Sequence, residues 1–124
     1  MKQVLLILTL LSIANFAWSQ KSDWKEMHDF HAVMSKTFHP AESGNLQPTK
    51  DSVDVLIAKA KSWQASQIPK GYKKVETTQT LTELVKQCEA VKAAVSSKAS
   101  DEKLKALMTE AHDVFHKLTE KCRE

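Results

Sequence analysis

The chain has 124 residues, with 18 Lys and Arg against 15 Asp and Glu, which gives a formal net charge of +3. Positive and negative side chains are interspersed, and so small an excess gives no reason to expect nucleic acid as a partner. Only two glycines occur, and long stretches are rich in Ala, Lys, Leu and Glu, which favours one all-α domain.

Residues 1–19 have the pattern of a secretory signal peptide. A short start with one lysine precedes an apolar run, and Ala17 and Ser19 supply the small side chains that a signal peptidase reads. The run is short for a membrane span, which needs roughly 20 apolar residues. We therefore expect cleavage before Gln20 and a periplasmic or secreted protein without a membrane anchor.

The spacing of apolar residues predicts four amphipathic helices within a single domain, residues 20–124. Apolar side chains recur at steps of three and four in each helix. Pro40 is expected to end the first helix, Pro69 follows the second, and Ser100 or Asp101 caps the fourth. The predicted helices cover residues 22–38, 49–68, 77–96 and 101 to nearly the C-terminus.

Helices of this length with short connections predict an up-down-up-down antiparallel four-helix bundle. In that topology the last two helices form a hairpin that turns near Ala99, so Cys88 is level with about residue 110. Cys122 is then about 12 residues away, or roughly 18 Å along the helix, which is beyond the reach of a disulfide. We expect two buried thiols, with a disulfide or a ligand role as the alternative.

Four of the five histidines form two clusters, one early in the first helix and one late in the last. On a helical wheel His31 falls near the centre of the apolar stripe, where an imidazole needs a hydrogen bond, a metal or a haem iron, and His28 lies on its flank. His112 and His116 are spaced i, i+4, which lets two imidazoles share one ion, and they lie at the edge of their stripe. The two clusters meet if the first and last helices are neighbours.

A plainer interpretation stays open beside the metal site. His31 would be a core residue bonded to a neighbouring helix, and His112 and His116 a solvated pair near a helix C-terminus. His39 is about 12 Å along the axis from His31, so it is expected to lie apart. With Glu42 it would form a second, weaker metal site.

An exported bundle with Met27 early in its first helix and His112 or His116 late in its last resembles the soluble periplasmic b-type cytochromes. That resemblance implies haem b held non-covalently between Met27 and one of these histidines. The chain also resembles c′-type cytochromes in architecture, although it lacks their Cys-x-x-Cys-His attachment motif.

A second resemblance is to small periplasmic metal sensors and metal-resistance proteins, which bind nickel, cobalt, copper or zinc through His and Met on facing helices. The residues of matching type are His28, His31, His112, His116 and Met108.

The motifs of nucleophile elbows, phosphate loops and His-Glu-x-x-His metalloproteases are absent, so we expect no enzyme. The first hypothesis is an exported protein that binds zinc, copper or nickel between the first and last helices, for buffering, delivery or sensing. One alternative is a b-type haem protein for electron transfer. The other is an unliganded helical module that recognises a protein partner.

Overall fold

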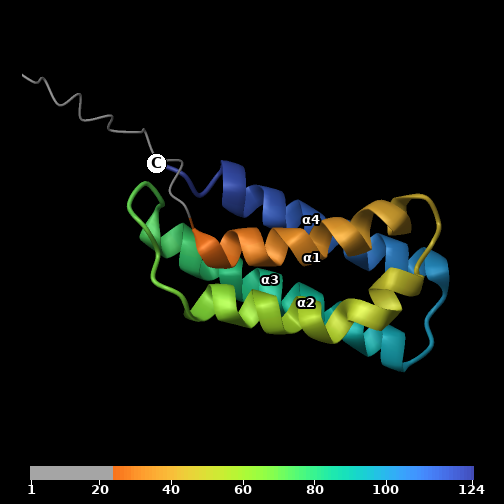
Figure 1. The fold of residues 1–124 in the computed structure, drawn as a ribbon. Helices are drawn as coiled ribbons and strands as arrows, with labels where there is room; N and C mark the ends of the chain where they lie inside the picture. The colour runs from red at the N-terminus through yellow and green to blue at the C-terminus, as the bar shows by residue number, and fades with distance from the viewer. Residues whose placement is uncertain (1–23) are drawn as a thin grey trace, which may run out of the picture.

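The computed structural model describes residues 24–124, and the predicted signal peptide and its cleavage site lie outside the described residues. Each helix in this part of the chain contacts its two neighbours, and successive helices run in opposite directions (Figure 1). The prediction of an all-α, up-down-up-down four-helix bundle is confirmed. The helices are α1 (Lys25–Glu42), α2 (Gln47–Ala65), α3 (Lys74–Ser96) and α4 (Asp101–Glu120).

The beginning of α1 and the end of α4 share one end of the bundle, as the topology predicts. The Trp24 ring contacts Tyr72 in the α2–α3 connection at 5.0 Å, and Tyr72 pairs through its backbone with Arg123. Among residues 24–124, no helix combines the length and the apolar character needed to cross a membrane.

The first helix continues through Pro40, where the sequence predicted its end. Proline cannot donate a hydrogen bond within the helix, but only the last half-turn of α1 follows it. The backbone N–H of Asn45 then closes the helix by donating to the Pro40 carbonyl at 2.9 Å. The extension buries Ala41 in a small apolar cluster with Leu46 and Leu104.

The second and third helices begin before their predicted positions, and the fourth begins where it was predicted. The second helix begins at Gln47 because Pro48 occupies its first turn, where a missing N–H is harmless. The third begins at Lys74. The fourth is capped as expected, since the Ser100 hydroxyl accepts a hydrogen bond from the Lys103 backbone N–H at 3.2 Å.

Aromatic rings fill the centre of the bundle. Phe30, Trp63 and Phe115 contact one another, with ring centroids 5.5 to 5.9 Å apart. Phe30 is fully buried and His31 is exposed, so the predicted position of His31 inside the core was wrong. Because Phe30 lies three residues after Met27, it moves the centre of the apolar stripe away from His31 and leaves the imidazole at the edge.

The two cysteines are buried and unpaired, which confirms the prediction of buried thiols. The amide of Gln87 donates to Glu110 at 2.8 Å, so Cys88 is level with residue 110 as expected. Cys122 lies just beyond α4, and its thiol donates to the Thr80 hydroxyl at 3.6 Å. Burial raises the pKa of the Cys88 thiol to about 12, so Cys88 is protonated and a poor nucleophile or metal ligand.

Candidate functional site: the seam between α1 and α4

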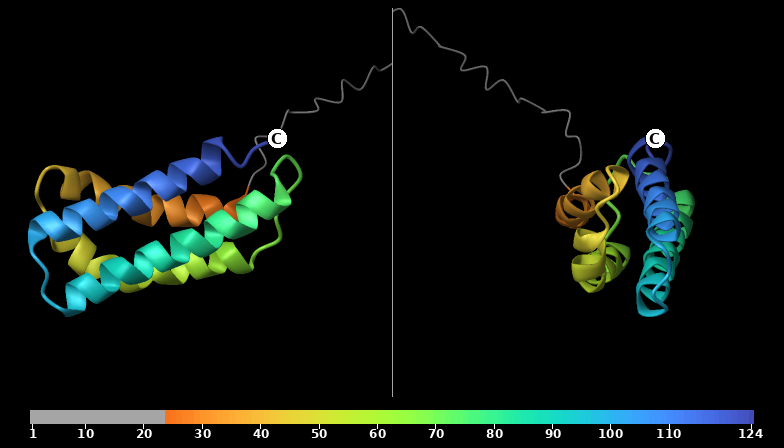
Figure 2. Two further views of the ribbon diagram at one scale, coloured as in Figure 1. Left: turned by 180° about the vertical axis from the view of Figure 1, so that it is seen from behind. Right: turned by 90° about the vertical axis from the view of Figure 1, so that its right-hand side faces the viewer.

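Helices α1 and α4 make the sparsest contact of the four neighbouring pairs. Figure 2 shows the bundle as an α1–α2 hairpin packed on an α3–α4 hairpin, and the two hairpins are joined more closely through α2 and α3 than through α1 and α4. Two ring stacks join α1 to α4. The His31 ring lies on Phe115 with centroids 5.2 Å apart and planes 4° from parallel, and Phe38 lies on His112 at 3.7 Å and 8°.

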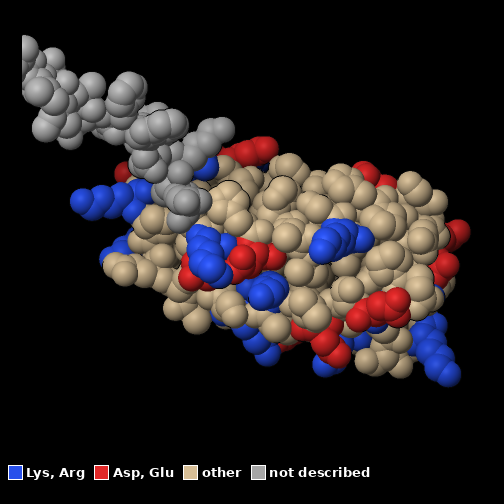
Figure 3. All heavy atoms as spheres, in the orientation of Figure 1, with Lys and Arg blue, Asp and Glu red and all other residues tan. Residues whose placement is uncertain are grey.

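Four histidines gather along this line, and we call them the histidine seam: His31 and His39 of α1 with His112 and His116 of α4. In Figure 3, lysine and arginine are scarce along the strip where α1 and α4 meet. A bound cation would therefore meet little repulsion there.

The closest polar contact of the seam joins His112 and His116. Their Nε2 atoms are 3.1 Å apart, and their rings stand at 73° to each other. The spacing of four residues places both side chains on one helix face, one turn apart. His112 is partly buried and the His116 side chain is 47% exposed, which agrees with the edge positions that the sequence predicted.

Glu120 fixes the orientation of this pair. Its Oε1 atom lies 3.3 Å from His116 Nδ1. Because an ionised carboxylate only accepts hydrogen bonds, it favours the tautomer of His116 with the proton on Nδ1. With that tautomer the lone pair of His116 lies on Nε2, which is 3.1 Å from Nε2 of His112.

Partial burial and the neighbouring His116 charge hold the pKa of His112 below its usual value of 6.5. The charges of Asp113 and Glu42 act in the opposite direction, and that of His39 acts with His116. His112 is therefore neutral at pH 7, and the neutral imidazole is the form that binds a metal ion.

His39 lies close enough to His112 for their charges to interact. Its Nδ1 atom is 3.5 Å from Glu42 Oε2, and both side chains are exposed. The predicted His39–Glu42 pair thus exists as a contact, and it lies along the same seam as the α4 pair. His112 stacks on Phe38, the neighbour of His39 in sequence, whereas His31 stacks on Phe115.

The predicted histidines of the main site do not converge on one point. Within residues 24–124, no three His, Cys, Asp or Glu side chains form a group that could hold a metal ion. His112 and His116 form a pair, and His31 joins the seam through Phe115. His28 is exposed on α1, one turn before His31.

The two methionines considered as cofactor ligands are core residues. Met27 is 8% exposed, and its sulfur accepts a hydrogen bond from the Tyr72 hydroxyl at 3.8 Å. Met108 is fully buried. The buried rings of Phe30 and Phe115 pack against each other in the same core, with centroids 5.7 Å apart.

Sequence reasoning missed three members of the site. Glu120 was detectable, because it continues the i, i+4 spacing of His112 and His116 by one more turn. Phe38 and Phe115 were assigned to the core, and nothing in their spacing indicates that each carries an imidazole from the opposite helix.

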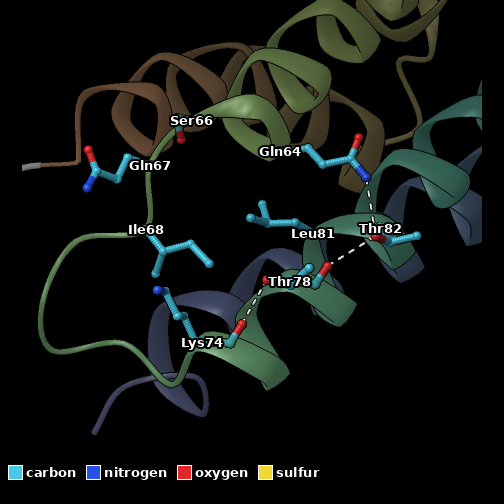
Figure 4. A pocket seen from close by; sticks show the side chains of 8 residues that line it. All are labelled: Gln64, Ser66, Gln67, Ile68, Lys74, Thr78, Leu81 and Thr82. Atoms are coloured by element: carbon cyan, nitrogen blue, oxygen red, sulfur yellow. Dashed lines mark hydrogen bonds between the residues drawn. The ribbon is translucent and has the colours of Figure 1, made fainter.

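A hollow elsewhere on the molecule holds no comparable chemistry. It has a volume of about 370 Å³ and lies between α3 and the connection that follows α2 (Figure 4). The amide of Gln64 donates to Thr82 at 3.2 Å beside it. None of its lining residues is a histidine, a cysteine or an acid; they are Gln64, Ser66, Gln67, Ile68, Lys74, Thr78, Leu81 and Thr82.

Comparison of the chain with protein-family models, with curated proteins and with solved structures found no match in any of the three.

Proposed function

We propose that this protein binds a divalent transition metal ion through the Nε2 atoms of His112 and His116. The observation that carries the proposal is their separation of 3.1 Å. Two nitrogen ligands at roughly 2.0–2.1 Å from a metal, at an angle of about 90–110°, are about 2.8–3.4 Å apart. The pair therefore has the spacing that a shared ion requires before any ion binds.

The contact between His116 and Glu120 supports the same proposal. A metal-binding histidine usually donates its second ring N–H to a carboxylate, which fixes the tautomer and raises the basicity of the ligand. Glu120 stands in that position at 3.3 Å. The ring of Phe38 stacks on His112 and restricts the rotation of the imidazole.

Imidazole nitrogens suit zinc, copper(II) and nickel. The burial of Met27 and Met108 removes the thioether ligands that would have favoured copper(I). Metal buffering, delivery or sensing in an exported compartment remains the role we propose. The compartment rests on the signal pattern of residues 1–19.

The haem alternative has less support from the geometry, since aromatic rings occupy the interior beside Met27 and the seam. The unliganded interaction module becomes the preferred account if the purified protein binds no metal.

Isothermal titration of the exported protein with zinc tests the proposal. Loss of either ligand, in His112→Ala or His116→Ala, should weaken binding at least as much as loss of an outer carboxylate partner, which is about 10–100-fold. The matched control is His28→Ala, an exposed histidine of α1 whose loss should leave the affinity unchanged. Equal affinity in the wild type and in the double variant at 112 and 116 would refute the proposal.

A further inference from the structure

The paired histidines offer fewer ligands than a zinc ion takes. Zinc in closed protein sites is bound by four ligands in a tetrahedron. The described part of the chain brings no third His, Cys, Asp or Glu side chain into a group with the pair. His39 of α1 interacts electrostatically with His112, but its Nδ1 atom is engaged with Glu42 at 3.5 Å. An ion held by His112 and His116 alone would keep two positions open.

Those open positions face outward. The His116 side chain is 47% exposed, and the pair lies at the edge of the core stripe of α4. Ligands for the remaining positions can therefore reach the ion from outside the molecule.

We infer that a second copy of this chain completes the site, so that one zinc ion is held by His112 and His116 of both copies. The inference rests on the metal binding proposed above. In a dimer with two-fold symmetry the same surface serves both partners. If the axis passes through the ion, the two α4 helices cross and four imidazole nitrogens form a closed tetrahedral site.

The surface of α4 around the pair suits such a crossing. Thr109 lies three residues before His112, and Thr119 lies three residues after His116, so both continue the face of the pair. In an antiparallel crossing Thr109 of one copy faces Thr119 of the other. Their hydroxyls already donate to the carbonyls of Lys105 and His116, at 2.9 and 3.1 Å, so covering them leaves no donor unpaired.

Charge also favours the crossing. Lys117, the cation next to His116 in sequence, reaches away from the pair to Glu83 of α3, with a separation of 3.4 Å. The strip where α1 and α4 meet carries few lysines or arginines (Figure 3). Two copies can therefore approach at this face without bringing cations together at its centre.

Sedimentation velocity of the exported protein, with zinc as the probe, tests the inference. We expect a monomer in EDTA, and with zinc a species of twice the mass that contains one ion per two chains. His116→Ala should stay monomeric in zinc, and His28→Ala should dimerise as the wild type does.

The outcomes separate the two proposals. A monomer that binds one zinc per chain would overturn the bridged dimer and keep the proposed function. A wild-type chain that binds no zinc would overturn both.

A second variant tests the crossing without removing a ligand. Thr109→Arg places a cation on the face of the pair and should weaken zinc-dependent dimerisation by at least tenfold, while one chain still binds zinc. Dimerisation as tight as that of the wild type would overturn the proposed crossing.

Discussion

Two seams of this bundle hold their helices together by different chemistry. Across α2 and α3, lysines pair with carboxylates, in Lys61–Glu89 at 3.6 Å and Lys92–Asp54 at 2.7 Å. Across α1 and α4, imidazoles stack on phenylalanines. Exposed ion pairs contribute little to stability. The histidine seam contributes aromatic packing, and it also places two imidazole nitrogens 3.1 Å apart where few cations lie.

The largest effect on stability is expected from breaking the aromatic support of the histidine seam. Phe115→Ala should destabilise the protein by about 3–5 kcal/mol, because it leaves a cavity beside Phe30 and Trp63 and removes the ring under His31. Urea unfolding measures the loss. Val75→Ala, at a side chain 65% exposed, is the control and should change stability by less than about 0.5 kcal/mol. A loss from Phe115→Ala as small as that of the control would contradict the packing described for the seam.

The second effect concerns the ligand pair and its carboxylate. Glu120→Gln keeps both ligands but weakens the interaction that orients His116, so zinc affinity should fall about 10–100-fold. Titration calorimetry measures the change. Glu110→Gln is the matched control, because Glu110 lies on α4 as well but accepts from Gln87 of α3. If both variants bind zinc as the wild type does, Glu120 has no part in the site.

A smaller effect is expected from pH. The folded protein holds the pKa of His112 below the value of 6.5 that an unperturbed histidine has. Between the lowered pKa of the folded protein and 6.5, the unfolded chain binds the proton more readily than the folded one. The contribution of His112 to stability should therefore be constant above about pH 6.5 and fall as the pH is lowered from there through the pKa of the folded protein. Urea midpoints at pH 7.5 and 5 measure the slope. His112→Gln should flatten it, and a variant that keeps the full slope would show that another group is responsible.

The smallest effect is expected at the α2–α3 seam. Lys61→Ala removes an exposed ion pair and should cost about 0–1 kcal/mol. Zinc affinity should not change. A loss of zinc binding in this variant would show that the two seams are not independent.

The sequence was sufficient for the architecture because each helix carries a continuous apolar stripe. Leu56, Ala60 and Trp63 of α2 are fully buried as their spacing predicts. At Pro40 the prediction failed, because the helix continues for two residues past the proline and Ala41 is buried in a small apolar cluster.

The candidate site was predictable only in part. The flank positions of His112 and His116 followed from the spacing along one helix. The position of His31 did not, because the predicted stripe ran through Met27, His31 and Met34 and left out Phe30, which is the buried residue. The nearness of His39 to His112 depends on how α1 and α4 are aligned. The spacing of residues within one helix does not determine how it is aligned with another.

The most direct test of the account follows the imidazole nitrogens themselves. In a ¹⁵N NMR spectrum of labelled protein that detects the ring nitrogens, zinc should shift Nε2 of His112 and His116 and leave both nitrogens of His28 in place. Shifts of those two Nε2 signals, with the signals of His28 unchanged, are the predicted result. Unchanged Nε2 signals, with zinc bound or unbound, would contradict the assignment of this pair as the metal site.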